Sequence, residues 1–313
     1  MTERIALKPK RIGIYGLVAE EKDIEFFSSG SKVLDLCLGG GWAERRVINI
    51  IGDTSTGKTL LCIEAAANFI RKYPQGKIRY CEAEAAFSRQ YAAAMGMPID
   101  KVDFGKEPIR TIEDLYEELE VRTEKAKQPE LMIVDSLDAL SSRAEMDRAI
   151  DKGSYGGEKA KQLSALFRRI NSAMAAKNIT MMIVSQIRDR IGVVYGRKWE
   201  VSGGHALAFY SSQRVVLKQL GKLKKTVRGI ERPIGIQVLA YLEKNKCGPA
   251  YREAMLPILF NFGIDDEKSC RDFLTKLKVK MSNKESLSVL HREVRREWLA
   301  LEESFAPKRK KYT

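Results

Sequence analysis

The feature that most restricts the fold of this chain is the octapeptide Gly52-Asp53-Thr54-Ser55-Thr56-Gly57-Lys58-Thr59, which matches G-x4-G-K-[ST] at every fixed position. An apolar, β-rich run at residues 46–51 precedes it, and a helical pattern at residues 60–72 follows it. A phosphate-binding loop needs this context, because its backbone N–H groups and the helix N-terminus must point at the same phosphates. The motif therefore predicts a nucleotide site within an α/β fold.

Two residues of this loop and one acid downstream predict the ligands. The Lys58 ammonium can reach the β- and γ-phosphates of a nucleotide, and the Thr59 hydroxyl can bind Mg²⁺. Asp135 ends a short apolar strand at residues 131–134, and an acid at that position lies beside the loop, where it can hold Mg²⁺ through water. We expect ATP and Mg²⁺ as ligands, with Thr59 and Asp135 as the metal residues and Ser136 able to assist.

Hydrolysis also requires a group that orients or deprotonates the attacking water. Glu82 and Glu84 directly follow the strand expected at residues 77–81. Taken alone, each of them fits a surface acid without a catalytic role better than a catalytic one.

Strands and helices alternate along the rest of the chain, which predicts a mostly parallel, doubly wound sheet flanked by helices. Further strands are expected at 180–185, 214–217 and 234–242, and helices at 33–38, 111–125 and 158–177. We divide the chain into a lead-in (1–27), an ATPase core with a glycine-rich, basic loop at 187–204 (28–264), and a helical C-terminal segment with a basic tail (265–313). No run of about 18 apolar residues is present, so no membrane span is expected. The five cysteines are scattered without a CxxC pair, which favours reduced, buried thiols.

The positive charge of the chain is concentrated in its middle. Residues 143–252 carry 22 Lys and Arg against 8 Asp and Glu, and this excess of 14 equals the net charge of the whole chain. A basic block of this size indicates a polyanionic partner. Charge alone leaves open whether that partner is a nucleic acid or an acidic lipid, or whether the block only keeps the surface soluble.

In order and spacing, these motifs resemble the core of the RecA recombinase family. The resemblance covers about residues 28–264 and rests on the octapeptide together with Ser29-Gly30-Ser31, Leu34-Asp35, Gly39-Gly40, Glu82-Ala83-Glu84 and Val134-Asp135-Ser136. Its most specific part begins at Ser185-Gln186-Ile187-Arg188, continues through 191–196, and ends at 203–212. That stretch resembles the segment with the second DNA-binding loop of bacterial and phage RecA proteins.

The resemblance implies roles for individual residues of the nucleotide site. Glu84 would activate water, and Gln186 would sense the γ-phosphate and transmit its presence to the following loop, with Lys58 as the third catalytic residue. Tyr91 would stack near the adenine. Lys244 and Lys246 would reach across a subunit interface to the ATP of a neighbour, and Phe209 would couple adjacent subunits.

The same resemblance implies a DNA-binding loop, and the charge of this region agrees with it. The expected DNA-binding residues are Arg188, Arg190, Arg197, Lys198, Trp199, Gly203 and Gly204. Basic side chains hold phosphates and aromatic rings can stack on bases. Trp199 fits either stacking on DNA or packing of the loop, whereas Tyr195 fits packing better. Residues 143–158 would form the first DNA loop.

The function implied is an ATP-dependent recombinase that forms a helical homo-oligomeric filament on single-stranded DNA and exchanges strands with homologous duplex DNA. Single-strand-binding or loader proteins would be its partners, and the interior of a bacterial cell its location, for a cellular or a phage protein alike. A hexameric RecA-fold helicase and a mediator that binds ATP and DNA but barely turns over remain alternatives. The tail Lys308-Arg309-Lys310-Lys311 would either recruit duplex DNA or only solubilise the chain.

Overall fold

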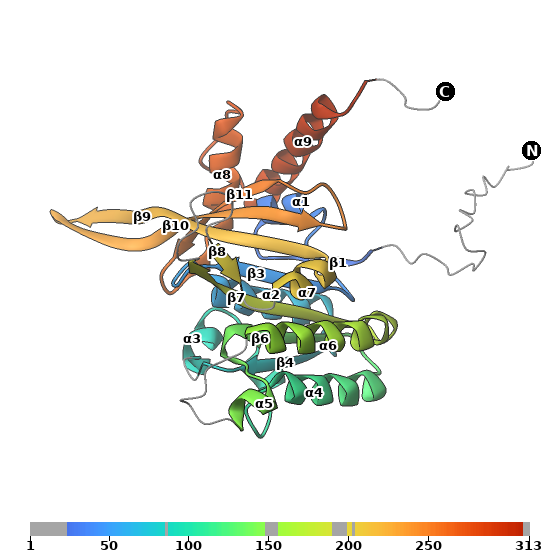
Figure 1. Cartoon of the computed structure of the whole chain (residues 1–313). Coiled ribbons are helices and arrows are strands. Elements are labelled where there is room, and N and C mark those ends of the chain that lie inside the picture. Colours follow the sequence, from blue (N-terminus) through green and yellow to red (C-terminus); the bar gives the residue numbers. More distant parts are fainter. Residues whose placement is uncertain (1–23, 85–86, 148–155, 190–198, 202–203, 309–313) are drawn as a thin grey trace, which may run out of the picture.

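A single large sheet forms the centre of the molecule. The computed structural model describes residues 24–84, 87–147, 156–189, 199–201 and 204–308 (Figure 1). The sheet has ten strands in the order β12-β11-β10-β9-β3-β7-β6-β4-β5, with β8 paired to β7. These strands are β3 (Val47–Gly52), β4 (Lys77–Glu82), β5 (Val102–Asp103), β6 (Glu130–Asp135), β7 (Ile179–Asp189), β8 (Trp199–Val201), β9 (Gln213–Val227), β10 (Ile230–Asn245), β11 (Glu253–Leu259) and β12 (Gly263–Ile264). The six strands from β9 to β5 pair in parallel and the others antiparallel, which confirms the predicted mostly parallel sheet.

Helices cover both faces of this sheet (Figure 1). One core cluster joins the sheet to α1 (Lys32–Leu38), α2 (Lys58–Lys72), α8 (Asp266–Lys276) and α9 (Leu287–Phe305). The other joins it to α4 (Ile112–Lys125), α6 (Gly156–Ala176) and α7 (Gly204–Tyr210). The short helices α3 (Arg89–Ala94), α5 (Arg143–Met146), η1 (Ile99–Lys101) and η2 (Leu137–Ala139) lie in the connections.

The apolar strands follow from burial on both faces. Along β6, Leu131 and Ile133 belong to the first core cluster, while Met132 and Val134 belong to the second. A strand whose alternate side chains are all buried has no polar face, so its sequence is a continuous apolar run. This arrangement explains why the short apolar runs of the sequence predict the central strands well.

The strands β9 and β10 extend far beyond the predicted runs at 214–217 and 234–242. They form a long antiparallel hairpin that pairs from Gln213 and Asn245 out to Val227 and Ile230 and projects from the sheet (Figure 1). Its outer half is exposed, so no buried apolar run marks it in the sequence. The two strands predicted from the sequence were therefore too short.

The two ends of the described chain pack on the core differently. β1 (Phe26–Phe27) pairs with β2 (Trp42–Ala43) and places buried Phe27 against Phe69. The C-terminal segment expected to be helical contains α8 and α9. No described helix has the length and apolarity that crossing a membrane requires.

Candidate nucleotide-binding site

The octapeptide forms a tight loop between β3 and α2, as predicted. Ser55 and Gly57 have φ angles of 58° and 89°, which curl the backbone into the left-handed region. A Cβ on Gly52 would lie 2.5 Å from Thr56 Oγ1, and one on Gly57 would lie 2.7 Å from Ile258 Cδ1. A side chain at Gly52 would displace the Thr56 hydroxyl, and one at Gly57 would be strained by the positive φ of that residue. The loop residues Gly52, Asp53, Thr54, Ser55, Thr56, Gly57, Lys58 and Thr59 therefore form a narrow cradle at the N-terminus of a long helix, where backbone N–H groups favour an anion.

Lys58 lies folded over this loop. Its Nζ donates to the carbonyl oxygen of Asp53 at 2.6 Å, and its residue surface is only 8% exposed. Burial lowers the pKa of Lys58, although the carboxylates of Asp135 and Glu84 act in the opposite direction. An anion in the cradle would compensate the ammonium charge more directly than a carbonyl does.

Thr59 and Asp135 meet at the predicted metal position. The Thr59 hydroxyl donates to Asp135 Oδ2 at 2.8 Å, and the Tyr80 hydroxyl donates to the same oxygen at 2.7 Å. Burial raises the pKa of Asp135, with its two hydroxyl donors opposing the shift. A hydroxyl and a carboxylate beside a phosphate cradle are the oxygen ligands that suit Mg²⁺. Tyr80 was missed by sequence reasoning, because nothing local marks a buried tyrosine as a neighbour of Asp135.

Glu84 and Gln186 come together at the carboxyl edge of the sheet, where Glu84 follows β4 and Gln186 lies on β7, with β6 between these strands. Gln186 Nε2 donates to Glu84 Oε1 at 2.8 Å, and the Ser136 hydroxyl also donates to that oxygen. The backbone N–H of Gln186 donates to Asp138 Oδ2 at 2.7 Å. In a parallel sheet the carboxyl ends of adjacent strands meet at one edge, which brings residues distant in sequence into one site.

A small cavity of about 60 Å³ opens between these groups. It is lined by Thr59, Glu82, Glu84, Phe87 and Asp135. The site therefore offers space for solvent beside both the predicted metal residues and Glu84.

A second hollow, of about 280 Å³, lies on the other side of the loop. It is lined by residues 55–60 together with Tyr91, Ile236, Ile258 and Phe260. Tyr91 is 39% exposed and Phe260 is 54% exposed. Apolar and aromatic side chains next to a phosphate cradle can hold a planar base, so Tyr91 lies where a nucleotide base can reach it.

Lys244 and Lys246 lie at the far end of β10. Lys244 Nζ donates to the carbonyl oxygens of Ala208 and Phe209 at 2.6 and 2.8 Å. Lys246 Nζ donates to the Phe209 carbonyl at 3.4 Å and lies 5.6 Å from the centre of its ring. Burial lowers the pKa of Lys244 to about 8, with Lys246 and Arg214 adding to the shift. In the described part of the chain, both lysines bond to the end of α7 and not to the phosphate loop.

The segment at 187–204, expected to be a loop throughout, has strands at its flanks. β7 continues to Asp189 and pairs with β8, so that Arg188 lies opposite Glu200 and Asp189 opposite Trp199. Gly204 begins α7. The remaining predicted DNA residues Arg190, Arg197, Lys198 and Gly203 lie outside the described residues, as do residues 148–155 of the segment 143–158 expected to form the first DNA loop. The described ends of that segment belong to α5 and to the start of α6.

The β9–β10 hairpin adds a basic surface that sequence reasoning did not single out. Its exposed outer part carries Lys218, Lys222, Lys224, Lys225, Arg228 and Arg232. Lys224 forms an ion pair with Glu231 across the hairpin at 2.8 Å. Part of the central positive charge is thus gathered on one projecting element.

The comparisons with known proteins agree with this geometry. Residues 10–265 match the family model described as the RecA N-terminal domain. The Protein RecA of Leptospira meyeri is 32% identical over 261 residues, which is 81% of this chain and 63% of the relative. The Protein RecA of Trichodesmium erythraeum is 34% identical over 254 residues, which is 79% of this chain and 66% of the relative. The chain thus spans just under two thirds of the length of the curated relatives that it matches.

Proposed function

Because the chain belongs to the RecA family, we propose that it is an ATP-dependent recombinase that assembles on single-stranded DNA and promotes homologous pairing and strand exchange. The observation that carries this proposal is the hydrogen bond from Gln186 to Glu84. Gln186 lies on β7, directly before the three residues, 187–189, that pair with β8. One residue thus links the nucleotide site to the hairpin with the expected DNA residues.

The nucleotide would bind with its phosphates in the 52–59 loop and its base in the hollow beside Tyr91. Lys58 would turn from the Asp53 carbonyl to the β- and γ-phosphates. Thr59 and Asp135 would hold Mg²⁺, which neutralises charge on the phosphate oxygens. The Asp135 carboxylate would then face Mg²⁺ and the Lys58 ammonium would face phosphate. Each opposite charge offsets the free-energy cost of burying the group.

Glu84 is the proposed general base. Its carboxylate borders the small cavity lined by Thr59 and Asp135, where a water can lie between it and the terminal phosphate. Ser136 and Gln186 both donate to one Glu84 oxygen, which fixes the direction of the carboxylate. The other oxygen remains able to accept a proton from water.

Gln186 is the proposed link between nucleotide and DNA. Its side-chain amide can donate either to Glu84 or to a γ-phosphate that takes the place of that contact. A change of partner would shift the end of β7, and with it the β7–β8 hairpin. Such coupling requires that ATP favour one arrangement of the hairpin over the other, and DNA would then favour ATP binding in return.

Lys244, Lys246 and Phe209 are the proposed contacts with a neighbouring subunit. Phe209 is 67% exposed, and the two ammonium groups lie beside it on the same surface. In a filament, the lysines would exchange the carbonyls of α7 for the phosphates of the ATP bound by the neighbour. Nucleotide binding would thereby stabilise the filament.

The distribution of charge supports a nucleic acid as the polyanion. The expected DNA residues on the β7–β8 hairpin and the basic side chains of the β9–β10 hairpin belong to the same positively charged stretch of sequence. Contacts of this kind hold phosphates without reading sequence. Base pairing between the bound strand and a duplex would supply the specificity.

Electron microscopy of the purified chain with single-stranded DNA, Mg²⁺ and a slowly hydrolysed ATP analogue tests the proposal. We expect helical filaments that need both DNA and nucleotide and that are lost in Lys58→Ala. Closed rings would support a hexameric helicase instead. Filaments with the analogue, combined with an ATPase rate no higher than that of Lys58→Ala when ATP itself is supplied, would support a mediator.

A further inference from the structure

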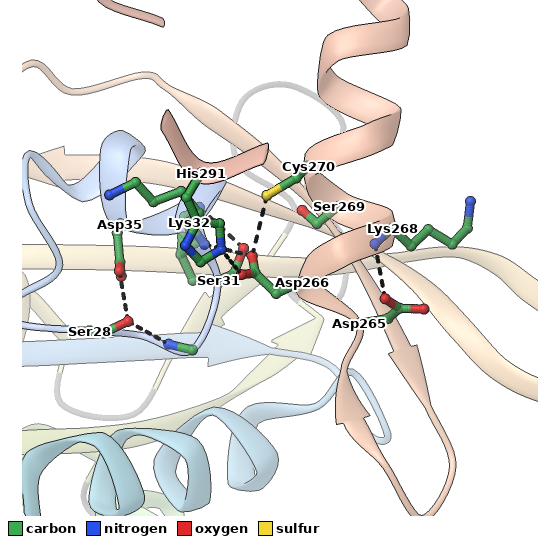
Figure 2. A network of polar contacts seen from close by, with 12 residues as sticks. Ser28, Ser31, Lys32, Asp35, Asp265, Asp266, Lys268, Ser269, Cys270 and His291 are labelled. Carbon is green, nitrogen blue, oxygen red and sulfur yellow. Dashed lines mark hydrogen bonds and ion pairs between the residues drawn. The ribbon is translucent and has the colours of Figure 1, made fainter. Parts of the chain in front are cut away.

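Three side chains with metal-binding atoms meet where α8, α9 and the start of α1 come together (Figure 2). Asp266 and Cys270 are four residues apart on α8, so they share one face of that helix. His291 reaches them from α9. The carboxylate oxygen, the sulfur and the imidazole nitrogen all lie within 4.8 Å of one another. This cluster lies outside the nucleotide site and plays no part in the mechanism above.

Asp266 is oriented by the core of the protein. The backbone N–H of Lys32, the first residue of α1, donates to Asp266 Oδ1 at 2.7 Å. Cys270 Sγ lies 3.7 Å from that oxygen, while His291 Nε2 lies 2.6 Å from Oδ2. One carboxylate oxygen is thus fixed by the backbone and the other faces the imidazole. Metal-binding carboxylates are commonly held in this way by a second hydrogen-bonding group.

We propose that Asp266, Cys270 and His291 form a binding site for Zn²⁺, distinct from the Mg²⁺ site of the nucleotide. Sulfur and imidazole ligands favour zinc, whereas Mg²⁺ and Ca²⁺ prefer ligand sets made of oxygen. In a tetrahedral zinc site the ligand atoms lie roughly 3.3–3.8 Å apart, and the 3.7 Å between Cys270 Sγ and Asp266 Oδ1 falls in that range, whereas the 2.6 Å between His291 Nε2 and Asp266 Oδ2 is shorter. On binding, the imidazole and the carboxylate would move apart to admit the ion.

The protons of the cluster balance on binding. The Cys270 thiol gives its proton to solvent and binds as the thiolate. His291 binds through Nε2 and keeps its single proton on Nδ1. The thiolate and the Asp266 carboxylate together neutralise the two charges of the ion, and water takes the fourth position. Cys270 is fully buried, whereas the His291 side chain is 34% exposed, so the ion enters from the side of His291.

Without a metal, Cys270 is a neutral thiol. Burial and the nearby Asp266 carboxylate raise the pKa of Cys270, so the thiol stays neutral until a cation arrives. The contact of His291 with Asp266 then acts as an ordinary structural pair. The metal replaces this pair by a stronger link between the same residues.

The position of the site gives the metal a structural role. α8 and α9 belong to the C-terminal segment, whereas Lys32 begins the first helix of the nucleotide-binding core. α9 already packs on the core through buried Leu290, Val294 and Trp298. A bound zinc ion would fasten the start of α9 to α8, and through Asp266 to α1. It would therefore stabilise the seating of the C-terminal segment on the core.

Metal titration of the full-length chain tests this inference. We expect the apo protein to bind a single Zn²⁺ per chain, and Co²⁺ in its place to give a thiolate-to-cobalt charge-transfer band. At a Zn²⁺ concentration about a hundred times the Kd, the Tm should rise by at least about 2 °C. Cys270→Ser and His291→Asn should lose the cobalt band and the Tm shift. Asp266→Asn, which keeps an acceptor for Lys32, should weaken binding while the chain stays folded by circular dichroism.

Matched controls come from the other cysteine and histidine positions. Cys247→Ser removes a half-buried thiol and His205→Asn removes the other histidine, and both variants should keep the cobalt band and the Tm shift. The inference is overturned if folded wild-type protein gives no cobalt–thiolate band. It is also overturned if Cys270→Ser binds zinc as tightly as the wild type, because binding then occurs elsewhere.

Discussion

Gln186 Nε2 donates to Glu84 Oε1 at 2.8 Å, which joins the end of β7 to the residue that follows β4 by two positions. These strands are not neighbours in the sheet, since β6 lies between them. The contact therefore crosses the carboxyl edge of the sheet above Asp135. The proposed link between ATP and DNA depends on this pair.

Glu84→Gln should lower the ATPase rate by about 10²–10⁴-fold, because an amide cannot take a proton from water. The glutamine is isosteric and can still accept from Ser136, so nucleotide affinity should change little. Steady-state ATP hydrolysis and binding of a fluorescent ATP analogue measure the two effects. An unchanged hydrolysis rate would remove Glu84 from the proposed mechanism and favour a mediator with little turnover.

Gln186→Ala should uncouple ATP from DNA, because no amide remains to exchange Glu84 for the γ-phosphate. In the wild type, the ATP analogue should raise the affinity for single-stranded DNA by about 5–150-fold. In Gln186→Ala we expect the same affinity with and without the analogue. Fluorescence anisotropy of labelled DNA with and without an ATP analogue measures it. Gln128→Ala, on an exposed loop before β6, is the control and should leave the effect intact. Full retention of the effect in Gln186→Ala would exclude this residue as the link.

Tyr80→Phe should weaken the use of Mg²⁺. The Tyr80 hydroxyl donates to Asp135 Oδ2, and loss of such an orienting partner commonly costs about 10–100-fold in metal affinity. The Mg²⁺ concentration for half-maximal ATPase activity should rise accordingly. Tyr73→Phe loses hydroxyl contacts to Glu25 and Glu44 instead, so its Mg²⁺ dependence should match the wild type. Equal Mg²⁺ curves for both variants would show that Thr59 alone orients Asp135.

Lys244 should make assembly sensitive to alkaline pH. Burial lowers its pKa to about 8 in the free chain, and contact with a phosphate favours the charged form. Above pH 8 the lysine must therefore take up a proton as subunits join, and assembly should weaken by up to about tenfold per pH unit. Folding of the free chain depends on pH in the opposite direction. The unfolded state keeps the Lys244 proton up to its ordinary pKa of 10.5, so the contribution of Lys244 to folding stability rises between pH 8 and that value.

Light scattering of assembly between pH 7 and pH 10 measures this dependence. Lys244→Arg keeps its charge throughout that range, so its assembly should lose the Lys244 component of the pH dependence. The same slope in wild type and variant would assign the effect to another group.

The loop at 52–59 and the place of Asp135 beside it were predictable from the sequence because their signals are local. Residues 52–59 include the glycines that the turn of the loop needs. Asp135 ends a strand whose continuous apolar run indicates burial on both faces. Tyr80 was not predictable, because its contact with Asp135 depends on the register of β4 and β6. The sequence alone does not show that the hydroxyl of a buried tyrosine donates to a particular carboxylate.

The β9–β10 hairpin and the Asp266–Cys270–His291 cluster were not predictable for a similar reason. Outside the sheet, the hairpin strands pair only with each other and need no apolar run. The cluster joins two helices through side chains 21 or more positions apart in sequence, without the short spacing that marks a zinc motif. Both features depend on how distant elements pack together, and local sequence patterns do not report such contacts.

The most direct test of the account is the steady-state ATPase rate with and without single-stranded DNA, with Lys58→Ala as the control. We predict strong stimulation by DNA in the wild type and no activity above background in Lys58→Ala, because the rate then depends on the phosphate loop and responds to the hairpin through Gln186. Activity of the wild type that is indifferent to DNA would contradict the proposed recombinase mechanism and would indicate a regulatory ATPase or a mediator.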